Sequence, residues 1–176
     1  MSNVKSVKAS EIGIRTPQPV ASISTHERAL QKAVLLMETY MKNGDIPAAL
    51  RNADTLIRLD PQTAVHHFNR ALLCQHQSQI ELAVYEFMQT IWLDPDGPYS
   101  DSARCFLEDL DILQLNLIIL LASDDLVFRT KLSRNCHEAA IERGFALSPT
   151  GEQLLQKFCE HGLAESPAPT RASQYH

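Results

Sequence analysis

The feature that most constrains the fold of this chain is an internal repeat. ALRNADTLIRLDP, residues 49–61, aligns with AVYEFMQTIWLDP, residues 83–95, at an offset of 34 positions (from 49 to 83). The shared positions are Ala49 and Ala83, Ile57 and Ile91, Leu59 and Leu93, Asp60 and Asp94, and Pro61 and Pro95, with Ile46 and Ile80 at the same offset upstream. A fixed period of this length predicts successive copies of one supersecondary unit.

Each copy carries the signals of two antiparallel helices. NGD, residues 43–45, interrupts the first copy, and Gly44 can take the left-handed conformation that ends a helix. Asp45 can cap the next helix, and Pro47 is tolerated in its first turn. The proline that closes each copy disfavours helical geometry in the residue before it and suits the first turn of the next helix. We therefore expect Ala49 and Ala83 where paired helices cross closely.

The period, the small residue within a helix and the closing Asp-Pro make residues 30–95 similar to two tetratricopeptide repeats. The resemblance implies a concave groove, lined by the first helix of each repeat, that binds a peptide or a partner helix. The groove positions that it assigns, besides Gln31, are Val34, Glu38, Met41, Val65, Phe68, Asn69, Leu72 and His76. Phe68 and Asn69 are the main candidates for recognition. The alternative is that terminal helices cover the groove and make these residues part of the core.

The segment HHFNR, residues 66–70, invites a chemical interpretation, but the repeat register gives its residues structural positions. His67 is expected between helices, His66 towards the outer side, and Ala71 where a neighbouring helix approaches. The resemblance also tests one class of ligand. A clamp for a peptide's terminal carboxylate would place Lys or Asn where this chain has Val34 and Glu38, so that ligand is not expected.

The remaining sequence predicts an all-α protein in which a short array of helical hairpins is capped by further helices. A capping box at Ser24 and Glu27 starts the helical part, with the two hairpins over residues 24–97. Residues 98–163 predict a long helix over 100–125 and short helices over 124–135, 136–144 and 149–161. The apolar positions of the long helix are Phe106, Leu110, Leu113, Leu117 and Leu121, and Leu107, Ile118, Ile119 and Leu120 widen this apolar face. Residues 1–23 and 164–176 lack periodicity and are expected to be flexible tails.

Composition narrows the partners and the location. The net charge of −5 and the pI near 5.8 give no basic surface for nucleic acid. The longest apolar run, residues 115–122, is far shorter than the roughly 20 residues of a membrane span. Four scattered cysteines in a chain with an ordinary core indicate reduced thiols. We expect a cytoplasmic protein that binds another protein or peptide, or itself.

The candidate catalytic and metal-binding residues are poorly spaced for chemistry. Cys74 and His76, like Cys159 and His161, lie two residues apart, whereas two helical ligands of one ion need a spacing of three or four. No nucleophile elbow or glycine-rich phosphate loop occurs. The carboxylates of Glu108, Asp109 and Asp111 are expected to solvate one helix face. The sequence therefore predicts no enzyme, no metal and no cofactor, with a helical enzyme or metal protein as the least favoured alternative.

A second resemblance concerns the C-terminal helices. The pattern of Phe128-Arg129, Leu132, ERGF at 142–145 and Leu147-Ser148 is similar to helical segments in leader regions of some ribosomally made peptide precursors and in small subunits of certain ring-opening dioxygenases. It covers about thirty residues of generic helical pattern. The alternative function is an accessory or regulatory subunit whose C-terminal helices, and not the groove, make the contact.

Overall fold

The computed structural model describes residues 24–162, which form an all-α protein with no strand in that range. The helices are α1 (Thr25–Lys42), α2 (Ile46–Leu59), α3 (Ala64–His76), α4 (Ile80–Leu93), α5 (Ser100–Asp124), α6 (Leu126–Arg134), α7 (Cys136–Glu142), α8 (Pro149–Lys157) and the π-helical turn η1 (Phe158–Gly162). The tails expected over 1–23 and 164–176 lie outside the described residues. None of the helices within 24–162 combines the length and the apolar character needed to cross a membrane.

The helix boundaries follow from local hydrogen bonds that the sequence predicts. The Ser24 hydroxyl oxygen accepts from the Glu27 N–H at 3.1 Å, and a carboxylate oxygen of Asp45 accepts from the Ala48 N–H at 3.1 Å. Such caps satisfy N–H groups that lack a partner in the first helical turn. Gly44 has a φ of +74°, which ends α1 as expected. The predicted break between the paired helices is therefore confirmed.

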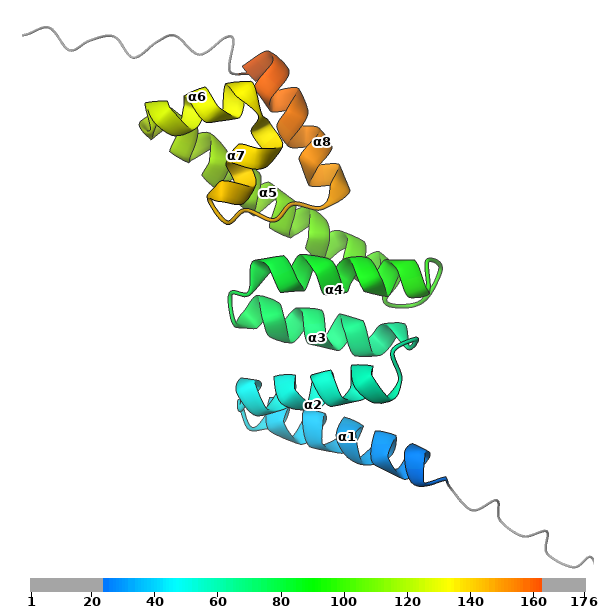
Figure 1. Ribbon diagram of the computed structural model, residues 1–176. Coiled ribbons are helices and arrows are strands. Elements are labelled where there is room, and N and C mark those ends of the chain that lie inside the picture. Colours follow the sequence, from blue (N-terminus) through cyan, green and yellow to red (C-terminus); the bar gives the residue numbers. More distant parts are fainter. Residues whose placement is uncertain (1–23, 163–176) are drawn as a thin grey trace, which may run out of the picture.

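Two antiparallel hairpins, α1–α2 and α3–α4, stack in layers at the N-terminal end of the molecule (Figure 1). Ala49 and Ala83 are fully buried, which confirms their position at close helix crossings. The first hairpin encloses a core around Met37 and Leu56, and the second encloses a core around Phe87. Since each hairpin leaves one apolar face uncovered, the next helix in the chain must close it.

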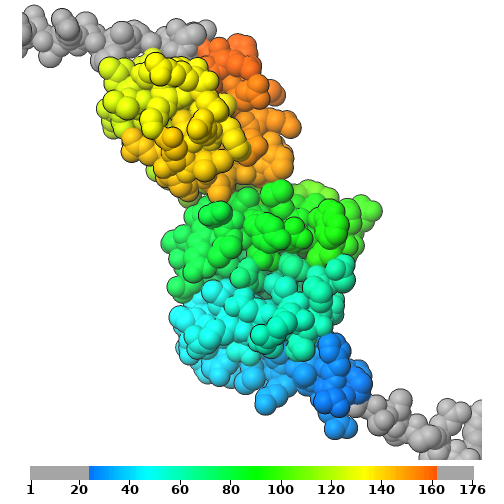
Figure 2. Space-filling model, in the orientation of Figure 1, coloured from blue at the N-terminus to red at the C-terminus, as the bar shows by residue number. Residues whose placement is uncertain are grey.

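Helix α5 belongs to two cores. Its N-terminal half closes the core of the second hairpin with Ala103, Leu107 and Leu110. Its C-terminal half packs against α6, α7 and α8 around Ile118 and Phe128. In Figure 2 the yellow and orange block of α6–α8 adjoins the green and cyan hairpins, and the outline of the molecule narrows where the two blocks meet.

The buried face of α5 differs from the predicted one. Leu113 and Leu117 are exposed, whereas Gln114 and Asp111 are buried. The Gln114 side chain exchanges two hydrogen bonds of 2.8 Å with the backbone of Ala146, in the loop before α8. The expectation that Asp111 is solvated is wrong, because its carboxylate accepts hydrogen bonds from the backbone N–H and the hydroxyl of Ser148.

Candidate functional site

Phe68, the aromatic residue expected to face a concave groove, is only 8% exposed. Its ring lies 5.8 Å from Phe87, 5.2 Å from Tyr99 and 6.1 Å from Phe106, measured between ring centroids. Because aromatic clusters of this kind contribute to core packing, Phe68 holds α3, α4 and α5 together. The expectation that Phe68 is available to a ligand is wrong.

The other seven predicted groove residues retain some exposure. Glu38, Met41 and His76 are exposed, and Val34, Val65, Asn69 and Leu72 are half-buried. Val34 packs against the core of the first hairpin, and Leu72 packs against the core of the second. The face on which the resemblance places these residues of α1 and α3 is called the concave face below. Asn69 is a half-buried polar residue of this set.

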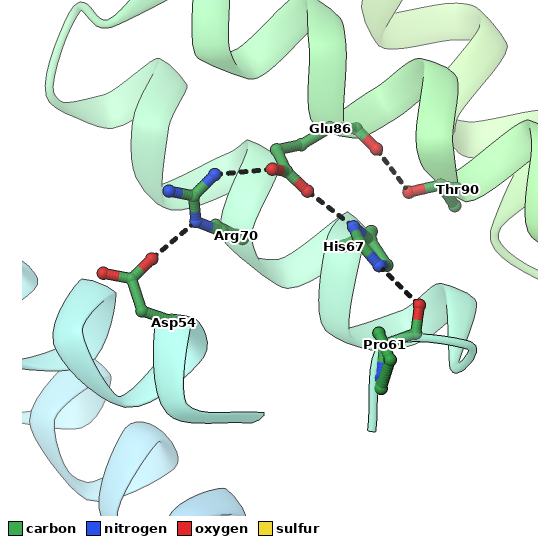
Figure 3. Close-up of polar contacts among 6 residues, drawn as sticks. All are labelled: Asp54, Pro61, His67, Arg70, Glu86 and Thr90. Carbon is green, nitrogen blue, oxygen red and sulfur yellow. Dashed lines mark hydrogen bonds and ion pairs between the residues drawn. The ribbon is translucent and has the colours of Figure 1, made fainter. Parts of the chain in front are cut away.

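His67 and Arg70 of HHFNR take part in a polar network between helices, drawn in Figure 3. The Glu86 carboxylate on α4 lies 2.6 Å from Nδ1 of His67 and 2.5 Å from a guanidinium nitrogen of Arg70. The second ring nitrogen of His67 lies 3.0 Å from the carbonyl oxygen of Pro61, and Nε of Arg70 donates to Asp54 at 2.7 Å. The network thus ties α2, α3 and α4 together.

The protonation of His67 follows from these partners. A carboxylate and a carbonyl oxygen both accept, so both ring nitrogens donate only when the imidazole is protonated. The hydrogen bond to Glu86 raises the pKa of His67, against the desolvation that lowers it. The four groups carry two positive and two negative charges, each with a partner, so the network stabilises the fold and leaves no free base or nucleophile.

His66 has a different environment from the outer position expected for it. It is 6% exposed, and Nε2 of its ring lies 4.0 Å from Asp60 without a hydrogen-bond partner. Burial lowers the pKa of His66, which keeps its ring neutral. The expectation that His66 lies on the outer side is therefore wrong, while the expected burial of His67 between helices is confirmed.

A groove opens between α4, α5 and α8, with a volume of about 780 Å³. Its apolar lining residues are Met88, Ile91, Trp92, Leu107, Ile112 and Leu154. Arg104, Glu108, Asp111 and Ser148 supply the nearby polar groups. Trp92 is 71% exposed, an unusual state for so large an apolar side chain. None of the eight residues predicted for the concave groove lies in this α4–α5–α8 groove.

Two sets of hydrogen bonds fix the walls of the α4–α5–α8 groove. Asp111 of α5 binds Ser148, the residue that caps α8, so these two helices are held together at the groove. Arg104 donates to Asp101 at 2.9 Å and to the carbonyl oxygen of Pro95 at 2.8 Å.

The sequence alone does not reveal this groove, because α8 forms one wall through contacts distant in the chain. The repeat does contain a signal, since exposed Trp92 stands where the first copy has Arg58.

A smaller hollow of about 280 Å³ lies beside α7 and the N-terminal part of α8. Nδ1 of His137 lies 3.2 Å from a carboxylate oxygen of Glu152 at its edge, and Cys136 contributes to its lining. Burial and the neighbouring Cys136 raise the pKa of Cys159 to about 12, so this thiol stays protonated at neutral pH. Within residues 24–162, no three His, Cys, Asp or Glu side chains converge on one point that could hold a metal ion.

The geometry therefore presents two surfaces for association, the half-exposed concave face on α1 and α3 and the apolar α4–α5–α8 groove. The groove has an apolar lining and an exposed aromatic residue, features common at sites of protein association. The chain matches no protein-family model, and neither a curated protein nor a solved structure is detectably similar to it.

Proposed function

We propose that this protein is a non-catalytic, cytoplasmic interaction module built from two tetratricopeptide-like hairpins, which binds a segment of another protein. The observation that carries the proposal is the apolar α4–α5–α8 groove with the exposed Trp92. Water-exposed apolar surface of this extent is unfavourable in an isolated protein, and a partner that covers it gains the free energy of its burial. The 34-residue repeat and the antiparallel hairpins support the tetratricopeptide assignment.

The test is affinity capture from native extract by four forms of the chain. These are the wild type, Trp92→Ala in the groove, Asn69→Ala on the concave face, and the double variant. Neither Trp92 nor Asn69 is buried, so replacing either side chain leaves the cores intact. Circular dichroism should therefore show unchanged helicity. We expect a partner retained by the wild type to be lost with Trp92→Ala. An identical set of captured proteins on all four forms would contradict the proposal.

The second candidate function is an accessory subunit that makes its contact through α6–α8. It is favoured by two adjacent apolar residues at the start of α6, Leu126 and Val127, which are both exposed. Replacing both by Asp leaves the C-terminal core untouched and removes this patch. Partner capture that survives Trp92→Ala and is lost with the two Asp substitutions would favour the accessory subunit. Deletion of residues 124–176 separates this candidate from binding at the concave face.

A further inference from the structure

We infer that the α4–α5–α8 groove takes an amphipathic α-helix of a partner protein, which lies where the second helix of a third hairpin would lie and presents a basic side chain to Glu108. The inference rests on the proposed function and specifies the kind of partner. It follows from comparing residues of α4 and α5 with the residues 34 positions earlier in the chain.

The repeat period shows that a helix is missing at this position. The second helices of the two hairpins begin at Ile46 and Ile80, 34 residues apart. One further period leads to Gln114, where α5 continues for another ten residues to Asp124 instead of turning back. The third unit therefore has a first helix, the N-terminal half of α5, but the chain does not turn back into a second helix directly after it. Helix α8 reaches α5 at Asp111, but only after α6 and α7 in the chain.

Two residues that line the groove correspond to residues that contact α4 one repeat earlier. Thirty-four positions before Glu108 stands Cys74, which is fully buried in the core that α4 shares with α3. Likewise Arg104 corresponds to Arg70, whose guanidinium group binds Glu86 of α4. The surface that α4 covers in the second hairpin is thus present again at α5, without its helix.

At three positions this second surface is apolar where the first is polar. Met88, Trp92 and Ile112 stand where the preceding repeat has the polar residues Asp54, Arg58 and Ser78. Apolar substitutions at these outward positions favour an occupant that buries them. An amphipathic helix with one apolar stripe meets this requirement, since its backbone hydrogen bonds are satisfied internally and its other face stays in water.

The charge of the occupant follows from Glu108. This carboxylate occupies the position of Cys74, which is fully buried beneath α4. A helix docked in the same way would cover Glu108, and a covered carboxylate without a partner is strongly unfavourable. Arg104 is already engaged by Asp101 and the Pro95 carbonyl group. The occupant therefore supplies the positive charge from its own Lys or Arg.

The experiment uses α4 itself as the template for the probe, because α4 fills the equivalent surface. Two helical peptides have the sequence of Ile80–Leu93 with Trp92→Phe, and one of them also carries Glu86→Lys. Residue 86 is the position to vary, because in the folded chain Glu86 binds Arg70 and its charge contributes to the raised pKa of Cys74. Arg70 and Cys74 are the residues that correspond to Arg104 and Glu108. The protein contains a single tryptophan, Trp92, so its emission reports directly on the groove.

We expect a blue shift of the Trp92 emission on titration, and binding of the Lys peptide about tenfold tighter than that of the Glu peptide. Glu108→Lys should reverse the order of the two peptides. The matched control is Asp109→Lys, which makes the same change of charge on the neighbouring exposed residue, outside the groove lining. It should leave the order unchanged.

Three results would overturn the inference. In the first, the two peptides bind equally well whatever residue stands at 108. In the second, neither peptide shifts the emission, while capture of a partner depends on Asn69. The protein would then bind its partner through the concave face and not through the groove, so the proposed partner-binding function would be retained. In the third, the emission of the protein alone shifts with its concentration and ultracentrifugation shows a dimer, which assigns the groove to a second copy of the chain.

Discussion

At the scale of single residues, the pairing of His67 with Glu86 shows how this fold uses charge. Both ring nitrogens of His67 face acceptors, and Glu86 also binds Arg70. Glu86 is almost fully buried, and a buried carboxylate requires such compensation. The sequence identified His67 as a residue between helices but not its partners, because Glu86 lies 19 positions away on another helix and no local spacing pairs them.

The His67 interaction predicts a pH-dependent stability. Its pKa is raised in the folded state, so its contribution to the free energy of unfolding is fully present below the unfolded pKa of about 6.5 and is lost as the pH rises through the folded pKa. His66 acts in the opposite direction, because burial lowers its pKa and protonation below about pH 6.5 favours the unfolded chain. The difference between wild type and His67→Gln isolates the first effect.

We expect the stability advantage of the wild type over His67→Gln to be largest near pH 6 and to shrink as the pH rises. Urea unfolding at a series of pH values measures it. His76→Gln is the control, since His76 is exposed and its replacement should leave the profile unchanged. An advantage of the wild type that grows with pH would show that His67 is neutral in the fold.

At the scale of helices, the sequence predicted where the helices begin and end better than it predicted which residues of each helix are buried. Ser24 and Asp45 cap helices as predicted, and Asn135 and Ser148 cap α7 and α8 in the same way, since capping depends on neighbours within three residues. The apolar spacing of α5 did not predict that Asp111 is buried. A polar residue becomes buried when a distant segment supplies its hydrogen bonds, and periodicity contains no information about that segment.

The contact between α5 and α8 gives a prediction for Gly151. In most helices Gly→Ala is stabilising by about 1 kcal/mol. Here a Cβ atom at position 151 would lie 2.4 Å from a carboxylate oxygen of Asp111, which is held in place by Ser148. We therefore expect Gly151→Ala to destabilise the protein by about 1–3 kcal/mol, as overpacking does elsewhere. Thermal unfolding measures the change.

Thr150→Ala is the control for Gly151→Ala, because Thr150 is exposed in the same helical turn. Combining Gly151→Ala with Asp111→Ala should cost less than the sum of the two single changes, since removal of the carboxylate makes room for the new methyl group. Strict additivity would show that the crowding is not the cause.

At the scale of the whole molecule, α5 joins two cores that share no other helix. The hairpin array could be predicted from the repeat, whereas the α4–α5–α8 groove could not, because Leu154 reaches it only through the fold of α6–α8. The domain boundary expected at residues 97 and 98 falls just before α5, yet the N-terminal half of that helix completes the core of the second hairpin.

Separate cores predict separate stabilities. Phe128 is fully buried in the C-terminal core, and Phe128→Ala should cost about 3–5 kcal/mol there. Hydrogen exchange followed by mass spectrometry should show faster exchange in α6–α8 and in the second half of α5. We expect α1–α3 to exchange as in the wild type. Equal acceleration throughout residues 24–162 would show that the two cores unfold as one unit.

The shared helix α5 also sets an order of events during synthesis. The chain is synthesised from its N-terminus, so Trp92 and Ile112 are added before Leu154 of α8. The 42 residues from 112 to 154 take about 2–8 s to add at ordinary translation rates. The α4–α5 surface is thus synthesised before its third wall. A partner that requires all three helices therefore recognises the finished protein and not the growing one.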